Sequence, residues 1–389
     1  LGEDNKIQLE QKRKNCWNKK WLFFPLFLED DTMEDRYTRQ IRLNEVGKAG
    51  QKKLTEAKVL VVGAGGLGCP ALQYLAAAGV GTLGIVDFDL VTLTNLHRQI
   101  VFEQSDVGRN KAEAAKEKLE RLNSKININA YTTSFQLSNG RELLQSYDLV
   151  LDATDNFASR YCINDFCVIL DKPMVYAALY KFQGQVAVFN YKGGPTYRCL
   201  FPTPPKPDEV PNCEMTGVLG VVPGLLGVLQ ATEVLKIILN LKTVLSGKLL
   251  CYDLLSHETK QIEIKPNRAA IATLKEKNSP KEELQLDCND SLQIDLFSVQ
   301  DQSNIVWVDV REKGELPLVS LNNQIHLPQS KWEKEWELLK NEETKIVFCQ
   351  SGQRSKKATA LFRRKGILNC YSLSVGATTL QTWNQKEKK

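Results

Sequence analysis

A single cysteine opens a short polar loop in the last fifth of the chain, and a thiol in such a loop can act as a sulfur nucleophile. The loop reads CQSGQRS at residues 349–355 and directly follows the apolar run KIVF. Successive backbone N–H groups in a tight loop favour an anion, and Arg354 adds positive charge. Both features favour the thiolate, the reactive form of cysteine. The predicted active loop comprises Cys349, Gln350, Ser351, Gly352, Gln353, Arg354 and Ser355.

A glycine-rich loop far upstream has the spacing of a phosphate-binding site. The sequence GAGGLG at residues 63–68 lies between an expected strand and an expected helix, and Asp87 ends the next expected strand. Glycines let the backbone approach a phosphate at a helix N-terminus, where free N–H groups and the helix dipole favour anions. The acid suits a ribose hydroxyl, so the pattern taken alone also fits NAD binding. The glycines of the loop are Gly63, Gly65, Gly66 and Gly68.

Positively charged side chains follow that acid and change the predicted chemistry. Arg98 and Lys111 are expected to converge on the phosphate side of the loop, together with Arg39 from the upstream segment RYTRQIRL. Positioned cations stabilise the charge that develops on a transferring phosphoryl group. An NAD-dependent oxidoreductase needs an apolar slot for nicotinamide and a proton-transfer group, and the sequence specifies neither. Phosphoryl chemistry is therefore favoured over oxidation.

Carboxylates at the end of a further strand predict a magnesium ligand. The segment DATDN at residues 152–156 ends an expected buried strand, where ligands of open α/β sheets bind. Mg²⁺ is usually held by one or two carboxylates together with substrate phosphates, and Asp155 is the predicted carboxylate. The other predicted nucleotide-site residues are Asp89, Asn95, Gln99 and Asn156.

Strands and helices alternate as in a parallel, doubly wound sheet. Residues 58–65 and 81–89 read as strands on either side of a helix that Gly79 closes, which is a βαβ unit. A long apolar helix is expected at residues 222–239. We predict an α/β fold with a Rossmann-like doubly wound domain followed by a small α/β domain. The predicted boundaries are 33–265 for the first domain, 266–291 for a polar linker and 292–389 for the second domain.

Size and composition favour a globular protein of two domains. The chain has 389 residues, of which 42% are hydrophobic and 25% charged, and its net charge of +5 is spread along its length. We therefore expect no direct nucleic-acid partner. No apolar run approaches the ~20 residues that span a bilayer, so no membrane association is expected. The 10 cysteines lack paired spacing, which indicates a reducing compartment and a cytoplasmic protein.

The first 32 residues do not share the pattern of the rest. The apolar segment WLFFPLF is short and split by Pro25, and EDD follows it instead of a small-residue cleavage site, so it does not fit a secretory signal. Interpretable pattern begins at Met33. We expect residues 1–32 to be a disordered or spurious extension.

Ordered sequence blocks over residues 36–265 resemble the ThiF/MoeB/HesA family of sulfur-carrier adenylyltransferases, which are relatives of the ubiquitin-activating enzymes. The blocks are RYTRQIRL, VLVVGAGGLGCPALQYLAAAGVG, IVDFDLVTLTNLHRQ, VGRNKAEAA, DLVLDATDNFASRY, TYRCLFP and GVLGVVPGLLG. The resemblance implies that ATP binds at the glycine loop with Mg²⁺. It also implies that the C-terminal Gly-Gly carboxylate of a small ubiquitin-like sulfur-carrier protein attacks the α-phosphate. The family's nucleotide and magnesium positions fall on Gly65, Asp87, Asn95, Arg98, Lys111 and Asp155.

The same resemblance implies a homodimer and a departure at a zinc site. Arg39 falls on the arginine that reaches into the partner's nucleotide site. Many family members bind zinc with two CxxC pairs, but here Thr196 replaces the leading cysteine of the first pair, and IKPNRAAIATL has no cysteine where the second pair is expected. Cys199 alone cannot supply the four ligands of a structural zinc site. We therefore predict that the chain binds no zinc.

Residues 293–389 resemble a rhodanese domain through WVDVRE, VFCQSGQRS and SVGATTLQTW. The resemblance implies that Cys349 carries a persulfide, loaded by a donor such as a cysteine desulfurase. In the adenylyltransferase family, the position of Cys213 is that of a second, conjugating cysteine on a crossover loop. The cysteines expected in the core are Cys69, Cys162, Cys167 and Cys251.

The two resemblances together imply adenylylation followed by sulfur transfer. The persulfide of Cys349 attacks the acyl-adenylate, and Cys213 cleaves the acyl disulfide to leave a thiocarboxylate on the carrier. This chemistry serves molybdopterin, thiamine and tRNA-thiolation pathways, and the sequence fits each of them. Two alternatives stay open: an enzyme that adenylylates a non-carrier substrate such as a tRNA base, and a non-catalytic carrier-binding scaffold. The appended cysteine loop argues against the first, and the intact phosphate-facing residues argue against the second.

Overall fold

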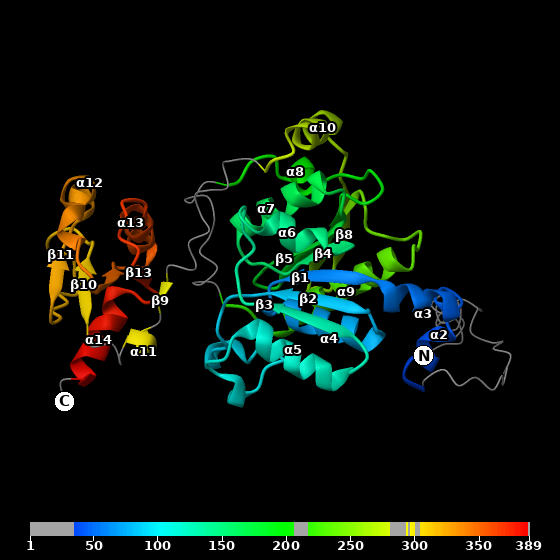
Figure 1. Cartoon of the computed structure of the whole chain (residues 1–389), viewed down its shortest axis with the longest axis horizontal. Helices are drawn as coiled ribbons and strands as arrows, with labels where there is room; N and C mark the ends of the chain where they lie inside the picture. The colour runs from blue at the N-terminus through cyan, green and yellow to red at the C-terminus, as the bar shows by residue number, and fades with distance from the viewer. Residues whose placement is uncertain (1–34, 206–216, 281–292, 295, 300–303, 388–389) are drawn as a thin grey trace, which may run out of the picture.

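The computed structural model describes residues 35–205, 217–280, 293–294, 296–299 and 304–387, which contain two β-sheets, each with its own helices (Figure 1). Cys213 and residues 1–32 lie outside the described residues, so the expectations for them stay predictions. Each sheet is described below by itself.

The larger sheet is a mostly parallel sheet of eight strands. Its strands are β1 (Lys58–Val62), β2 (Thr82–Val86), β3 (Asn127–Tyr131), β4 (Leu149–Asp152), β5 (Met174–Tyr180), β6 (Gln183–Phe189), β7 (Lys248–Asp253) and β8 (Thr259–Glu263). Their order is β3-β2-β1-β4-β5-β6-β7-β8. Strands β1 to β5 pair in parallel, whereas β6, β7 and β8 join in antiparallel fashion. This topology confirms the predicted doubly wound α/β fold.

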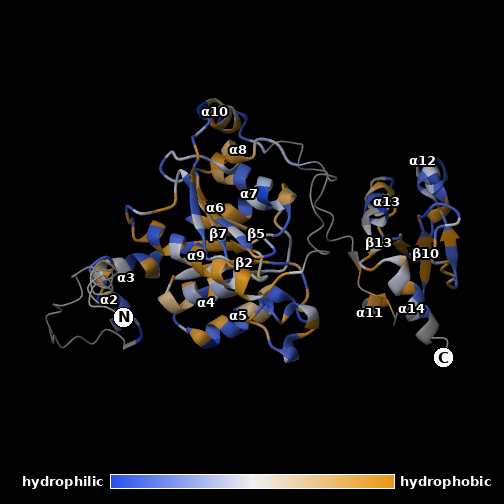
Figure 2. Ribbon diagram, turned by 180° about the vertical axis from the view of Figure 1, so that it is seen from behind, coloured by the Kyte–Doolittle hydropathy of each residue, from blue (hydrophilic) through white to orange (hydrophobic). Residues whose placement is uncertain are grey.

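Helices cover both faces of this sheet because the buried strands are apolar on both sides. Val59 and Val61 of β1 face one core cluster, and Leu60 and Val62 face another, as alternation along a strand requires. Figure 2 shows hydrophobic residues gathered in the strands and hydrophilic ones on helices such as α5. The helices are α2 (Thr38–Ile41), α3 (Gly47–Glu56), α4 (Gly68–Ala78), α5 (Lys111–Leu122), α6 (Gly140–Gln145), α7 (Phe157–Ile169), α8 (Tyr197–Leu200), α9 (Val221–Ile238) and α10 (Arg268–Lys277).

Helix α9 is the long apolar helix that the sequence predicts. It is long and apolar enough to cross a membrane, judged by length and composition alone. However, it packs against α4, β5 and β6, and a Cβ on Gly227 would stand 2.2 Å from the backbone oxygen of Leu67. Leu226 fills the space beside Gly184 of β6. These contacts are those of a core helix, and they explain its apolar composition.

The segment at residues 266–291, expected to be a linker, begins with a structured helix that belongs to the first sheet. Helix α10 packs on α7 and buries Leu274. The Arg141 side chain donates to the Asn278 carbonyl at 2.9 Å, and Lys275 pairs with Asp171 at 2.8 Å. The expected linker was therefore too long at its start: charged residues made α10 look like solvated chain, but one buried leucine and these contacts hold it in place.

The smaller sheet is parallel throughout and has the order β11-β10-β12-β13-β9. Its strands are β9 (Gln293–Ile294), β10 (Ile305–Asp309), β11 (Gln324–His326), β12 (Thr344–Phe348) and β13 (Cys370–Leu373). Its helices are α11 (Leu296–Val299), α12 (Trp332–Glu335), α13 (Gln353–Arg364) and α14 (Ala377–Glu387). Val306, Val308 and Val347 face one cluster, whereas Trp307 and Ile346 face the other.

Candidate functional site

The glycine loop makes a tight turn from β1 into α4 and leaves open space beside one of its glycines. Gly63 has φ of 99°, and a Cβ on Gly68 would stand 2.0 Å from the Gly63 oxygen, so neither position accepts a side chain. A Cβ on Gly65 would meet one atom within 4 Å, the Gln99 Nε2 at 3.7 Å. No side chain caps the N-terminus of α4. An open backbone at an uncapped helix start fits a phosphate group.

Asp87 stabilises the glycine loop through hydrogen bonds to two backbone N–H groups. One carboxylate oxygen accepts the Ala64 N–H at 2.7 Å, and the other accepts the Asp89 N–H at 2.9 Å. Burial raises the pKa of Asp87 to about 6, against the opposing effect of Lys111. The sequence predicted a ribose contact for this acid. The structure adds a supporting role that sequence reasoning missed.

Lys111 is held at the same edge of the sheet by a short ion pair. Its Nζ lies 2.7 Å from the Asp89 carboxylate, and the Lys111 side chain is only 7% exposed. Burial lowers the pKa of Lys111, but Asp87 and Asp89 outweigh it and the net shift is upward. Lys111 therefore carries its proton at neutral pH. The Asp155 carboxylate also raises the pKa of Lys111, so Asp155 lies within electrostatic range of the Lys111 ammonium.

Asn110 is a structural residue of the site that the sequence analysis did not single out. Its side-chain oxygen caps α5 by accepting the Ala112 N–H at 2.9 Å, and its amide donates to the carbonyls of Asp87 and Asp89, both at 3.2 Å. Asn110 thus ties the end of β2 to the start of α5. An asparagine immediately before a charged helix is a capping signal that could have found it.

Arg98 and Gln99 approach the glycine loop from a 3-10 turn that includes Asn95. The N–H groups of Arg98 and Gln99 both donate to the Asn95 carbonyl at 3.0 Å. The Arg98 side chain passes Gly66, where a Cβ would lie 3.5 Å from Arg98 Cδ. Gln99 is 3% exposed, and its Oε1 has no hydrogen-bond partner among the described residues. A buried, unsatisfied oxygen beside an open glycine backbone fits a site that a polar ligand completes.

The end of β4 supplies the expected carboxylates, with different roles for each. Asp152 is buried and pairs with Arg160, whose Nε lies 3.3 Å away. Asp155 is exposed, and Asn156 caps α7 by accepting the Ser159 N–H at 2.8 Å. No cluster of three or more metal-binding side chains occurs among the described residues. Asp155 alone fits the Mg²⁺ arrangement in which substrate phosphates provide further ligands.

Arg39 does not join the other cations within its own chain, which corrects the expected convergence. The neighbouring Gln40 donates to the Ala78 carbonyl at 2.9 Å, and Tyr37 packs on Gly79, so α2 lies at the C-terminal end of α4. The glycine loop lies at the opposite end of that 11-residue helix, about 15 Å away. Arg39 is exposed, and its expected role in a partner's site stays a prediction.

Cys199 lies where many family members have a zinc ligand, and here its sulfur accepts hydrogen bonds from two backbone N–H groups. Its sulfur accepts the Thr196 N–H at 3.3 Å and the Asn267 N–H at 3.2 Å. Asn267 in turn caps α10 by accepting the Ala270 N–H. The thiol thus joins α8 to the start of α10 through hydrogen bonds.

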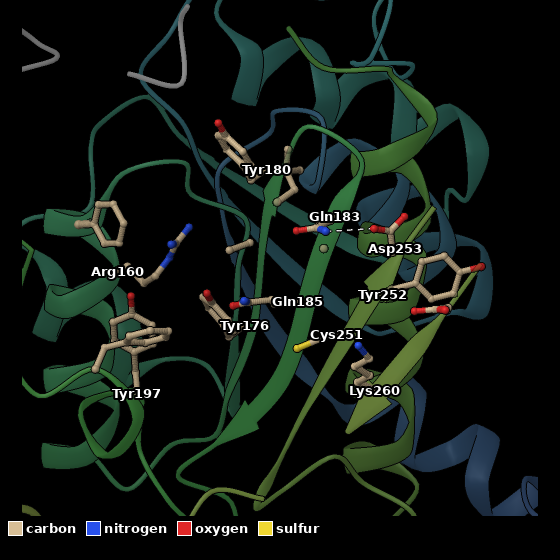
Figure 3. A pocket seen from close by; sticks show the side chains of 16 residues that line it. Arg160, Tyr176, Tyr180, Gln183, Gln185, Tyr197, Cys251, Tyr252, Asp253 and Lys260 are labelled. Atoms are coloured by element: carbon tan, nitrogen blue, oxygen red, sulfur yellow. Dashed lines mark hydrogen bonds between the residues drawn. The ribbon is translucent and has the colours of Figure 1, made fainter. Parts of the chain in front are cut away.

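A cavity of about 500 Å³ opens over the antiparallel part of the large sheet (Figure 3). Phe157 and Arg160 from the start of α7 line it, together with Tyr176 and Tyr197. Arg160 stacks over the Tyr176 ring at 5.1 Å and donates to the Thr154 carbonyl at 2.8 Å. Asp155, the candidate magnesium ligand, does not itself line the cavity, but Phe157 follows it by two residues. Sequence reasoning missed it because its walls come from distant strands.

The cysteine loop joins β12 to α13, and its thiol is almost completely buried. Cys349 is 1% exposed, and its sulfur accepts the Ser355 N–H at 3.3 Å. The Ser355 hydroxyl lies 3.6 Å from the sulfur and accepts from the Ser372 hydroxyl at 2.8 Å. Gly352, with φ of 85°, turns the chain into the helix. The Ser355 N–H therefore approaches the sulfur from the first turn of α13, and the expectation that successive N–H groups stabilise a thiolate stays a prediction.

Arg354 is paired, which corrects the expectation that it adds net positive charge to this loop. Its two terminal nitrogens lie 2.5 and 2.6 Å from the two oxygens of Glu315. The hydrogen bonds from Arg354 lower the pKa of Glu315 to about 2, so both groups are charged at neutral pH. The expected core cysteines Cys69, Cys162 and Cys167 are buried, and Cys251 is partly buried.

Comparisons with known proteins match this architecture. A model of the ThiF family matches residues 37–272, and a model of the rhodanese-like domain matches residues 295–381. The adenylyltransferase and sulfurtransferase MOCS3 of Anopheles gambiae is 47% identical over 68% of this chain and 58% of its own length. Its counterpart in Xenopus laevis is 36% identical over 84% of this chain and 81% of that protein.

Two further comparisons concern the first domain. The sulfur carrier protein adenylyltransferase of Thermus thermophilus is 48% identical over 60% of this chain and 88% of its own length. The crystal structure of E. coli MccB matches with a TM-score of 0.56 at 21% identity, over 68% of this chain and 78% of that chain, which shows a shared fold.

The chain covers 50–58% of the length of the MOCS3 proteins of Anopheles gambiae, Aedes aegypti and Culex quinquefasciatus. The ThiF match nevertheless extends over more than half of the present chain, and the rhodanese-like match follows it. The resemblance stated from the sequence blocks is thereby confirmed. The chain belongs to the ThiF family and carries a rhodanese-like domain after its ThiF domain.

Proposed function

We propose that this protein uses ATP to adenylylate the C-terminal Gly-Gly carboxylate of a ubiquitin-like sulfur carrier, and then transfers sulfur to it from a persulfide on Cys349. The observation that carries the proposal is that three features lie at one edge of the sheet. They are the open glycine loop, the Arg98 side chain beside Gly66, and the buried, protonated Lys111. The same chain holds a buried cysteine at the start of a helix in a rhodanese-like domain.

In the first step, a carrier carboxylate oxygen attacks the α-phosphorus of ATP, and the bond to pyrophosphate breaks. Lys111 and Arg98 offset the negative charge on the phosphates. The Oε1 of Gln99, which has no partner among the described residues, accepts a hydrogen bond from the nucleotide. Asp155 would hold Mg²⁺, and the bound ion would neutralise phosphate charge. The cavity beside Phe157 and Arg160 admits the carrier's C-terminal segment.

In the second step, the outer sulfur of the Cys349 persulfide attacks the acyl carbon, and AMP leaves. An acyl disulfide between carrier and Cys349 results. The Cys213 thiolate then attacks the Cys349 sulfur, which releases the carrier thiocarboxylate and leaves a Cys213–Cys349 disulfide. A cellular thiol reductant must reset that disulfide, which agrees with the proposed cytoplasmic location.

Molybdopterin, thiamine and tRNA-thiolation pathways all consume carrier thiocarboxylates, and each stays compatible with the site. The persulfide donor that we propose is a cysteine desulfurase. We also propose a homodimer in which Arg39 of one subunit completes the nucleotide site of the other.

ATP–pyrophosphate exchange measured with and without a carrier ending in Gly-Gly tests the first step. Exchange that depends on the carrier is expected. Exchange that depends instead on a tRNA would favour the non-carrier adenylating enzyme, and no exchange with either would favour the scaffold.

The sulfur step is tested with Cys349→Ala, which should abolish thiocarboxylate and spare pyrophosphate exchange. Cys370→Ala is the matched control, because Cys370 is a buried cysteine of the same core whose pKa burial raises to about 12. Equal loss of both reactions in Cys349→Ala would contradict the proposed division of labour.

A further inference from the structure

The guanidinium of Arg98 is held through one of its three nitrogens. Its Nη1 donates to the Thr94 carbonyl at 3.2 Å and lies 2.8 Å from His97 Nε2. A guanidinium has donors and no acceptor, so the His97 nitrogen must accept this hydrogen bond. The imidazole is therefore neutral in this arrangement, with its proton on Nδ1. Neither acceptor carries a charge that would compete with a phosphate for Arg98.

The backbone that carries the two side chains is fixed. The Arg98 N–H donates to the Asn95 carbonyl at 3.0 Å. At the start of α9, a Cβ on Gly220 would stand 2.2 Å from the His97 carbonyl oxygen and 3.3 Å from Arg98 Cα. His97 and Arg98 therefore extend from an immobile turn, and the hydrogen bonds of Nη1 decide where the guanidinium lies.

The other edge of the Arg98 guanidinium, formed by Nε and Nη2, is open. These two nitrogens have no hydrogen-bond partner among the residues that the structure describes. Arg198 binds both oxygens of Asp165 through the same pair of nitrogens, at 2.6 and 2.9 Å, and such a fork also matches two phosphate oxygens. A Cβ on Gly66 would lie 3.5 Å from Arg98 Cδ, to which Nε is bonded. The open fork therefore begins beside the glycine loop.

We propose that His97 is a positioning residue for Arg98: by accepting from Nη1, its neutral imidazole keeps the Nε–Nη2 fork free for two phosphate oxygens of ATP. The inference rests on the proposed adenylylation, in which Arg98 contacts the phosphates. His97 acts through Arg98 and not on the nucleotide. A bound phosphate holds the guanidinium by itself, so His97 matters before binding, when it spares ATP the cost of ordering a long side chain.

The test compares His97→Leu with the wild type in carrier-dependent pyrophosphate exchange, with MgATP varied. Leucine accepts no hydrogen bond, so the KM for ATP should rise about fivefold, the size of one net hydrogen bond. The kcat should change by less than about twofold, because the bound phosphate then orders Arg98. His97→Gln should stay close to the wild type, since its amide oxygen can accept from Nη1.

Two further variants show whether the effect passes through Arg98. In an Arg98→Ala background, His97→Leu should cause no further rise in KM, because the contact that it removes is already absent. His326→Leu is the matched control in the smaller sheet, where His326 Nε2 lies 2.9 Å from the Arg311 carbonyl oxygen. It should leave pyrophosphate exchange unchanged.

An unchanged KM in His97→Leu, an equal rise in the Arg98→Ala background, or a fall in kcat at constant KM would each overturn the inference. A KM in His97→Gln as high as in His97→Leu would do the same.

Calorimetric titration of the full chain with MgATP separates this inference from the proposed function. A Kd about fivefold weaker in His97→Leu than in the wild type supports the positioning role whether or not a carrier gives exchange. A wild type that binds ATP without carrier-dependent exchange would contradict only the proposed reaction, and a wild type that binds no ATP would contradict both.

Discussion

At the scale of single residues, Lys111 carries the strongest argument for phosphoryl chemistry. It is buried, protonated and held 2.7 Å from Asp89 at the edge where the glycine loop opens. A cation is rarely buried unless its charge is used or matched, and the Asp89 partner of Lys111 is 48% exposed, on the solvent side of the pair. We therefore place Lys111 among the residues that touch the phosphates.

Lys111→Ala is expected to lower carrier-dependent pyrophosphate exchange by about 10²- to 10³-fold, the usual cost of removing one electrostatic stabiliser. Lys118→Ala is the matched control. Lys118 lies in the same helix and pairs with Glu103 and Asp106 at 2.7 and 3.0 Å. Equal losses in the two variants would show that ion pairing of α5, rather than phosphate contact, explains the effect.

Asp87 predicts a pH dependence of the same reaction. Its pKa is raised to about 6 in the folded protein, and protonation removes an acceptor from the Ala64 N–H that shapes the glycine loop. Pyrophosphate exchange should therefore fall as the pH drops through about 6. The stability effect has the opposite sign. The folded state binds this proton more tightly than the unfolded chain, so Asp87 contributes stability at low pH that is lost as the pH rises through about 6.

The measurement is a pH profile of exchange together with thermal unfolding at each pH. Asp87→Asn cannot titrate, and its profile should lack the limb near pH 6 while its overall activity is lower. A limb that persists in Asp87→Asn would assign it to another group.

At the scale of elements, the start of α5 links the sheet to the nucleotide site through one amide. Asn110→Ala removes the cap of α5 and both contacts to the segment that follows β2, at Asp87 and Asp89. Loss of a cap costs about 1 kcal/mol of stability, and exchange activity should fall as well because Lys111 is the first residue of the helix. Asn267→Ala removes the cap of α10 instead, so it should show a comparable drop in unfolding free energy with unchanged exchange. Similar activity losses in both variants would mean that general stability limits the reaction.

Local signals explain how far the elements could be predicted from the sequence. The helix after the glycine loop was expected to close at Gly79, and Gly79, with φ of 82°, is the residue that caps the C-terminus of α4. The long apolar run at residues 222–239 also placed α9 to within one residue at each end. Helix α10 was missed because its single buried leucine gives no periodic pattern. The Arg354–Glu315 pair was missed because it joins residues 39 positions apart, and no local pattern specifies such a contact.

At the scale of the whole molecule, the position of Arg39 predicts a site shared between subunits. Arg39 lies at the far end of α4 from its own glycine loop, and the homodimer that we propose would place it at the site of the other copy. Arg39→Ala and Asp155→Asn should each abolish exchange when pure. A mixture allowed to exchange subunits should recover about a quarter to a half of wild-type activity, because each mixed dimer contains one intact site. No recovery, with mixed dimers demonstrated by mass spectrometry, would show that the site is self-contained.

The burial of Cys349 has a consequence for following the reaction in time. Cys349 is 1% exposed, so its thiol should react slowly with alkylating reagents. In a persulfide, the terminal sulfur lies one S–S bond of about 2.05 Å beyond the Cys349 sulfur. We expect the loaded protein to be labelled much faster than the empty one. The fraction of protein that iodoacetamide labels in a short pulse would then report the fraction of molecules that carry a persulfide at each moment. The time course of sulfur loading could be followed in this way without a separate reporter.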